Sequence, residues 1–227
     1  MSAYHRYAIY VVPEGAFYRA GAAWLGWDSL AGQALAHPEV PGLPMPVADM
    51  TATPRKYGLH GTVKPPFRLA DGMTEAALRD ATAALCARLA PVDVPALALR
   101  QLGGFVAVVP DAPCAGLADL AAETVTTLDT FRAPPGDAEL AKRRKPGLSA
   151  RQEALLRQWG YPYVLDEFRF HLTLTGKLGA AAGPMADRLR AHFAPVLPQP
   201  FRVGSLCLMG EDAAGRFHVI QRYALSG

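Results

Sequence analysis

Two short apolar segments of this chain each carry a histidine followed two residues later by a threonine. They are LHGTV at residues 59–63 and FHLTL at residues 170–174. Both are rich in the residue types that favour strands, and side chains along a strand alternate between its two faces. The histidine and threonine of each segment should therefore point the same way. A fold that brings the segments together would place two imidazoles and two hydroxyls in one pocket.

The regions after the two segments also resemble each other in architecture. Each segment is followed by a glycine-containing turn, an amphipathic helix, a proline-rich link and a β-rich region, which is typical of a duplicated unit. Strands grouped with helices, without strict alternation, predict the α+β class. The strands are expected at residues 6–12, 57–67, 96–109, 168–175, 201–209 and 216–223, and the helices at 74–89, 117–128, 149–159 and 185–193.

Composition narrows the classes of protein to consider. The chain has 227 residues, of which 51% are hydrophobic and 19% charged, as expected of a globular protein that can bury a core. Its formal net charge of +3 permits an anionic substrate but does not favour a dedicated nucleic-acid binder. The three cysteines follow no CxxC pattern, so we expect neither a disulfide nor a metal site. With no signal peptide or membrane span in the sequence, the expected location is the cytoplasm.

The paired histidines suggest chemistry on a phosphodiester. Opening a cyclic phosphodiester needs a base to activate water, an acid for the departing oxygen, and donors for the phosphoryl oxygens. His60 and His171 are therefore the candidate acid–base pair, and either could take either role. Thr62 and Thr173 are the candidate phosphate donors. This scheme requires no metal or other cofactor.

Further residues near the motifs are candidates for substrate binding. Lys64 and Thr175 each follow a motif threonine by two residues and should share its face. Arg55, just upstream of the first motif, could bind an anion bidentately.

A second phosphate on the substrate would need another cation. Arg132 and Arg143 are candidates for that role, the latter within the basic run at residues 142–145. Tyr161 precedes the second motif and could line the same cleft.

The sequence resembles the 2H phosphoesterase superfamily, which carries paired His-x-Thr/Ser motifs and includes cyclic nucleotide phosphodiesterases and 2′,5′ RNA ligases. Longer strings are similar to one branch, the DUF1045 family, which is associated with phosphonate metabolism and carbon–phosphorus lyase operons. These strings are RYAIY (6–10), RKYGLH (55–60), KPPF (64–67), FRAP (131–134), WGYPY (159–163) and FHLTLTG (170–176).

The resemblance implies a bilobal, duplicated fold over residues 1–227, in which two antiparallel sheets face a central cleft and helices pack outside. We expect a first motif lobe at about residues 50–130, a connection at 131–148 and a second motif lobe at about 160–227. The resemblance also implies a metal-independent phosphodiesterase acting on a small phosphorylated substrate. Carbon–phosphorus lyase pathways generate a ribose 1,2-cyclic phosphate that carries a 5-phosphate, which is one such substrate. Gly61 departs from the superfamily pattern, and we expect it to loosen the strand or to let a ligand approach closely.

Two alternatives remain open at this stage. The same fold could process 2′,3′-cyclic RNA ends or ligate 2′,5′ bonds, although the modest charge disfavours RNA. The chain could instead be a non-catalytic module that binds a phosphorylated metabolite. No GxxxxGK[ST], GxGxxG, HExxH or GxSxG motif is present, so the signatures of an NTPase, a Rossmann oxidoreductase, a zincin and an α/β-hydrolase are missing.

Overall fold

A computed structural model describes residues 4–145 and 147–227 of the chain. Its strands are β1 Arg6–Val11, β2 Trp27–Asp28, β3 Gln33–Ala34, β4 Gly61–Phe67, β5 Val92–Val94, β6 Leu97–Leu102, β7 Phe105–Pro110, β8 Leu172–Thr173, β9 Phe201–Val203, β10 Ser205–Glu211 and β11 Phe217–Ala224. Its α-helices are α1 Gly15–Leu25, α2 Val47–Met50, α3 Glu75–Cys86, α4 Ala115–Thr127, α5 Asp137–Arg144, α6 Ala150–Trp159 and α7 Ala182–Phe193. Short 3₁₀ turns lie at Pro54–Lys56, Asp129–Phe131, Leu165–Glu167 and Gly179–Ala181.

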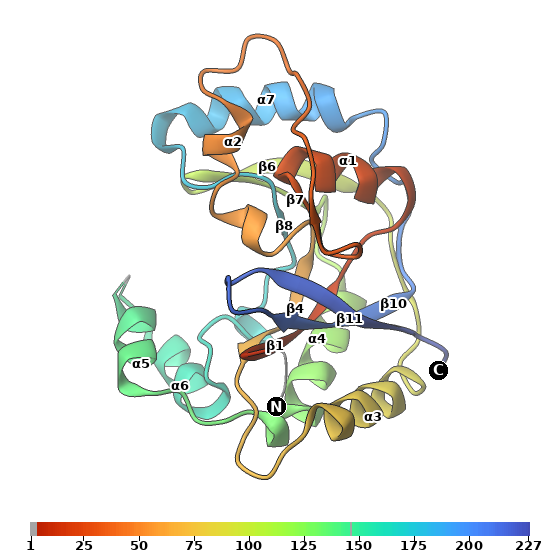
Figure 1. The fold of residues 1–227 in the computed structure, drawn as a ribbon, viewed down its shortest axis with the longest axis vertical. Helices are drawn as coiled ribbons and strands as arrows, with labels where there is room; N and C mark the ends of the chain where they lie inside the picture. The colour runs from red at the N-terminus through yellow and green to blue at the C-terminus, as the bar shows by residue number, and fades with distance from the viewer. Residues whose placement is uncertain (1–3, 146) are drawn as a thin grey trace.

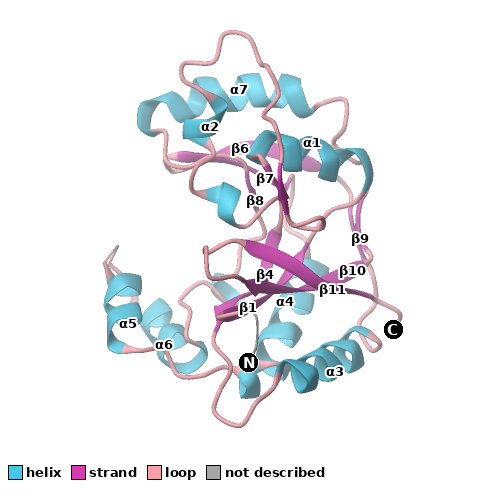
Figure 2. Cartoon of the chain, in the orientation of Figure 1, coloured by secondary structure: helices cyan, strands magenta, loops and turns pink. Residues whose placement is uncertain are grey.

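The main sheet has seven antiparallel strands in the order β11-β10-β1-β4-β8-β7-β6. The two motif strands, β4 and β8, are neighbours at its middle and pair through Gly61 and Leu172. Helices α1, α2 and α7 lie with strands β6 to β8, whereas α3 and α4 lie with β1, β4, β10 and β11 (Figures 1 and 2). The α+β class is therefore confirmed, and the two expected sheets join along the motif strands.

The expected lobe boundaries differ from the observed pairing. The hairpin β6–β7, which follows the first motif, pairs with β8 of the second motif. The hairpin β10–β11, which follows the second motif, pairs with β1 and so lies beside β4. The hairpin of each half of the duplicated pattern therefore pairs within the other half of the sheet. The two halves are for this reason not the continuous segments 50–130 and 160–227. The expected connection at 131–148 contains α5, and its residue 146 lies outside the described residues.

Capping residues in the sequence mark the observed helix ends well. The Thr74 hydroxyl accepts a hydrogen bond from the backbone N–H of Ala77 and caps α3. Ser149 and Gln152 form a reciprocal capping box at the start of α6, and Gly160 ends it in the left-handed conformation. In contrast, α1 was not expected, because its glycine- and alanine-rich sequence carries no capping signal.

Strand β1 shows how both faces of one half of the sheet are buried. Its odd-numbered residues, such as Ile9, belong to the main core, and its even-numbered residues, such as Tyr10, belong to a second cluster with Tyr18 of α1 and Phe217 of β11. Tyr10 pairs with Thr62 across the β1–β4 ladder, so both side chains lie on one face. The first motif therefore lies on the face of the second cluster.

Gly61 makes room for the second motif strand. A Cβ added at Gly61 would lie 2.4 Å from two atoms of the Phe170 ring. This space is on the core face, opposite the motif side chains, because Gly61 alternates with His60 and Thr62. The expectation that Gly61 admits a ligand was therefore wrong, since the Phe170 ring occupies this position.

The substitution Gly61→Ala should destabilise the fold by about 1–3 kcal/mol, because the buried Phe170 ring must shift to admit the methyl group. Urea unfolding measures this loss. Gly204→Ala is the matched control, since a Cβ there meets no atom within 4 Å, and it should change stability by no more than about 0.5 kcal/mol. Equal effects of the two substitutions would contradict this packing argument.

Candidate functional site

The register of β4 and β8 brings the four motif side chains to one face of the sheet. Gly61 pairs with Leu172 in an antiparallel ladder. Because the two strands run in opposite directions, His60 falls opposite Thr173 and Thr62 falls opposite His171. Directly opposite side chains share a face, with Cβ atoms about 4.5–5.5 Å apart, and diagonal pairs lie about 7–8 Å apart. The two histidines thus take one diagonal of a four-cornered site, and the two threonines take the other.

Two hollows at this four-cornered site each contain one motif histidine and one motif threonine, from different motifs, and a third hollow of about 650 Å³ borders His171 without a motif threonine. Of the first two, the larger, of about 450 Å³, is lined by Thr62 and His171. The smaller, of about 200 Å³, is lined by His60 and Thr173. This crossed composition agrees with the register, since opposite residues share a hollow.

Both imidazoles are oriented by the same kind of hydrogen bond. Nδ1 of His60 lies 2.9 Å from the carbonyl oxygen of Gly58, and Nδ1 of His171 lies 2.8 Å from that of Arg169. A carbonyl oxygen only accepts, so each Nδ1 carries the hydrogen and each Nε2 is left for chemistry. The Thr62 hydroxyl donates to Nε2 of His60 at 3.2 Å. Each imidazole therefore presents its Nε2 atom to the site.

His60 lies in an aromatic environment. The Tyr10 ring stacks on it with centroids 3.9 Å apart, and the Tyr57 ring lies at 5.6 Å. Burial lowers the pKa of His60 to about 4, and the charge of a protonated His171 acts in the same direction. His60 is therefore neutral near pH 7, with Nε2 able to accept a proton.

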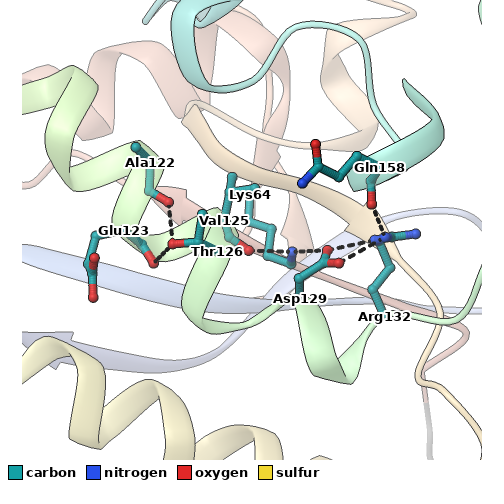
Figure 3. A network of polar contacts seen from close by, with 8 residues as sticks. All are labelled: Lys64, Ala122, Glu123, Val125, Thr126, Asp129, Arg132 and Gln158. Carbon is teal, nitrogen blue, oxygen red and sulfur yellow. Dashed lines mark hydrogen bonds and ion pairs between the residues drawn. The ribbon is translucent and has the colours of Figure 1, made fainter. Parts of the chain in front are cut away.

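Lys64 does not share the face of the motif threonine, contrary to the expectation from alternation. Tyr10 pairs with Thr62 but its neighbour Ile9 pairs with Lys64, so β4 has one extra residue at this point. This bulge turns Lys64 to the core side. Its ammonium donates to the carbonyl oxygen of Val125 at 3.1 Å and to Asp129 at 3.2 Å (Figure 3). Burial lowers the pKa of Lys64 to about 8 despite the nearby carboxylate.

Arg132 belongs to the same network as Lys64 and is partly exposed. Its guanidinium binds both carboxylate oxygens of Asp129, at 2.7 and 2.9 Å, and donates to the carbonyl oxygen of Gln158 at 3.0 Å (Figure 3). These contacts hold the pKa of Asp129 below its usual range, although burial opposes them. The network ties β4 to α6 and leaves Arg132 outside both hollows.

The structure also engages Arg55 and Thr175 in local hydrogen bonds. Arg55 donates to the carbonyl oxygen of Leu25 at 3.0 Å and to the Thr51 hydroxyl at 2.9 Å, which fixes the loop before β4. The buried Thr175 hydroxyl accepts from the backbone N–H of Val106 at 3.0 Å, although the residue borders the smaller hollow. The polar groups of both side chains are therefore used in hydrogen bonds within the protein.

Tyr161 and Arg143 meet at the edge of the larger hollow. Tyr161 lines this hollow, and the guanidinium of Arg143 lies 4.5 Å from the centre of its ring. Arg143 also donates to Glu139 at 3.5 Å. Burial raises the pKa of Tyr161, which keeps its hydroxyl protonated.

Sequence reasoning missed three residues of the site. Tyr10 and Tyr57 form the aromatic surroundings of His60, and Arg169 lines the larger hollow. Arg169 could have been found by continuing the alternation of the second motif two residues back from His171.

Comparison with known families shows to which family the chain belongs. A family model described as "Protein of unknown function (DUF1045)" matches residues 62–218, well over half of the sequence. The chain belongs to the DUF1045 family. The expected family is therefore confirmed at this level.

Two curated relatives of this DUF1045 chain carry the name ribose 1,5-bisphosphate phosphokinase PhnN. The one from Janthinobacterium sp. (strain Marseille) is 37% identical over 98% of this chain and 51% of its own length. The one from Laribacter hongkongensis is 39% identical over 92% of this chain and 49% of its own length. This chain thus spans about half the length of the curated relatives it matches.

Solved structures also align with the DUF1045 chain, at low sequence identity. Escherichia coli LigT in its apo form is 16% identical over 100% of both chains, with a TM-score of 0.48. The protein TT0787 of Thermus thermophilus is 14% identical over 98% of both chains, with a TM-score of 0.46.

The described residues, 4–145 and 147–227, lack both a clustered metal site and a membrane-spanning helix. They contain no group of three or more His, Cys, Asp or Glu residues placed to hold a metal ion. No helix among them has the length and apolar character needed to cross a membrane.

Proposed function

We propose that this site opens a cyclic phosphodiester on a small phosphorylated sugar or nucleotide, without help from a metal. The observation that carries the proposal is the crossed register of the motifs, which sets two imidazoles diagonally across one small site. A separation of about 7–8 Å lets one phosphoryl group lie between them, one hydrogen bond from each. In-line displacement needs a base and an acid on opposite sides of phosphorus, as this diagonal offers.

Each motif residue then has one task. Nε2 of neutral His60 takes a proton from water while the water oxygen forms a bond to phosphorus. The ring P–O bond breaks, and Nε2–H of His171 gives its proton to the departing oxygen. The hydroxyls of Thr62 and Thr173 donate to the non-bridging oxygens, for which Thr62 turns away from His60. Solvent returns the proton from His60 to His171.

The lowered pKa supports His60 as the base. A base must be neutral before reaction, and an imidazole with a pKa of about 4 is neutral across the physiological range. His171, at the larger hollow, then serves as the acid.

The relatives suggest a substrate within this class. They are named for ribose 1,5-bisphosphate. Hydrolysis of a ribose 1,2-cyclic phosphate 5-phosphate at the bond between phosphorus and the 2-oxygen yields that compound. We therefore propose this cyclic ester as the substrate and phosphonate metabolism as the setting. Phosphorus NMR of reactions with this compound, nucleoside 2′,3′-cyclic phosphates and oligonucleotides with cyclic ends tests the proposal. Turnover of the oligonucleotides alone, or binding without any turnover, would contradict it.

The pH dependence of kcat/KM should reveal the environment of His60. Because its pKa is about 4, the acid limb should fall well below the value of about 6.5 expected for a free imidazole. Tyr57→Ala, which opens His60 to water, should move that limb to higher pH. Rates measured from pH 4 to 9 decide this. A wild-type acid limb near 6.5 that Tyr57→Ala leaves in place would exclude His60 as the base.

Activity should persist after dialysis against EDTA, because the four motif side chains supply the base, the acid and the phosphoryl donors. The measurement compares kcat before and after chelation, with a zinc-dependent phosphodiesterase treated in parallel. Complete loss that added divalent metal restores would contradict the proposal.

A further inference from the structure

Arg169 differs from the arginines discussed above because, among the described residues, its guanidinium has no hydrogen-bond or ion-pair partner. Arg55, Arg132 and Arg143 all donate to protein acceptors. Arg169 is exposed, and within residues 4–145 and 147–227 its guanidinium makes no hydrogen bond and no ion pair. It lines the larger hollow together with Thr62 and His171. An unpaired guanidinium beside a phosphate site offers its donors to a second anion.

The backbone places Arg169 at a defined spacing from the motif. Phe168 has extended dihedral angles and β8 begins at Leu172, and Arg169 and His171, two residues apart between them, line the same hollow. Residues two apart along a strand lie about 6.6 Å apart. The carbonyl oxygen of Arg169 also accepts the Nδ1 hydrogen bond of His171, which fixes these two residues relative to each other. A second anion at Arg169 would therefore lie about one sugar ring from the phosphate at the motif.

The remaining lining of the larger hollow suits a sugar. Tyr161 and Tyr163 pack edge to face with centroids 5.8 Å apart, and such rings offer apolar faces with polar tips. Glu167 accepts from the Gln152 amide at 3.0 Å, and its free lone pairs suit a sugar hydroxyl. The same carboxylate repels an anion, which favours a position of the negative group at Arg169 and away from Glu167.

The smaller hollow is a weaker alternative for the second anion. It offers less than half the volume and is lined by the Tyr57 and Phe105 rings. Its exposed cation is Lys177, a flexible point charge without the planar fork that binds a phosphate bidentately.

We propose that Arg169 binds a terminal phosphomonoester of the substrate, and that the sugar lies in the larger hollow on the His171 side. This proposal rests on the proposed function and adds the specificity for a second phosphate. Arg169 thereby selects doubly phosphorylated cyclic esters over those that lack the distal phosphate.

The decisive experiment compares two substrates that differ only in the distal phosphate, ribose 1,2-cyclic phosphate with and without a 5-phosphate. Arg169→Met should lower kcat/KM for the 5-phosphorylated substrate on the order of 10- to 100-fold, mostly through KM, as expected for loss of a charged hydrogen-bond pair. For the substrate without the 5-phosphate, kcat/KM should change less than about twofold. Arg169→Lys should recover part of the loss. Arg157→Met, at an exposed arginine on the outside of α6, is the matched control and should affect neither substrate.

The outcomes separate this proposal from the function on which it rests. If Arg169→Met lowers kcat/KM equally for both substrates, or for neither, the assignment of Arg169 is wrong. The proposal of cyclic ester hydrolysis is not affected by that result. If Lys177→Met gives the selective loss instead, the sugar lies in the smaller hollow. Calorimetric titration with ribose 5-phosphate decides the assignment even if the wild type hydrolyses neither ester. Binding must then weaken in Arg169→Met and not in Arg157→Met, and equal affinity in both variants overturns the proposal.

Discussion

Alanine at His60 or at His171 should lower kcat for ring opening on the order of 10²- to 10⁴-fold and leave the fold intact. Each variant removes one half of the acid–base pair, a contribution of that size in enzymes of this kind. Neither imidazole is needed for packing in the way that Phe170 or Leu172 is, since both histidines are only partly buried. The expected loss is in kcat and not in substrate affinity.

The measurement is single-turnover hydrolysis followed by phosphorus NMR, with far-UV circular dichroism to check the fold. His5→Ala removes an exposed histidine outside both motifs and should retain full activity. His60→Ala and His171→Ala should also differ in pH dependence. Loss of the base at His60 should abolish the acid limb, which His171→Ala should retain. Full activity in both single variants would end the acid–base assignment.

The sequence predicted the part of the site that depends on strand alternation. The His-x-Thr spacing was enough to place each histidine beside its threonine on one face, because a strand has a strict period of two. The crossed partnership, with His60 opposite Thr173, could not be predicted, since it depends on the Gly61–Leu172 register between segments far apart in sequence.

The failures of prediction also have physical causes. Lys64 was misplaced because one extra residue in β4 reverses the alternation, and the prolines of KPPF, which cannot donate to the ladder, indicate an irregular strand but not which residue is extra. The hairpin exchange was missed because local patterns identify β6–β7 and β10–β11 but not the strands they pair with. Arg55 and Arg132 were assigned to substrate from their charge alone, whereas backbone carbonyl oxygens and Asp129 accept hydrogen bonds from their guanidinium groups.

Removal of the Asp129 carboxylate should destabilise the protein by about 3–5 kcal/mol at pH 7. Asp129→Ala leaves the buried Lys64 ammonium with a single carbonyl partner, and it leaves the Arg132 guanidinium without its carboxylate. Breaking a buried ion pair from one side costs this much because an uncompensated charge stays in the core. Lys64→Met should cost less than about 1.5 kcal/mol, since it removes that charge and keeps the pair of Asp129 and Arg132.

The pH dependence of this loss identifies its cause. Burial already lowers the pKa of Lys64 to about 8, and loss of Asp129 removes an interaction that opposes this shift. In Asp129→Ala the folded protein therefore releases the Lys64 proton at lower pH than the unfolded chain, whose lysine titrates near 10.5. Because the unfolded state then binds more protons, stability should rise as pH increases from 7 toward 10.

Urea unfolding at pH 7 and pH 9.5 measures both effects, with the double variant Lys64→Met/Asp129→Ala to complete the cycle. The double variant should be more stable than Asp129→Ala alone at pH 7, and the difference should shrink at pH 9.5. If Asp129→Ala is as stable as Lys64→Met at pH 7, the ammonium is not held in the core by this carboxylate. The ion pair with Asp129 would then not be what stabilises the bulge that turns Lys64 away from the motif face.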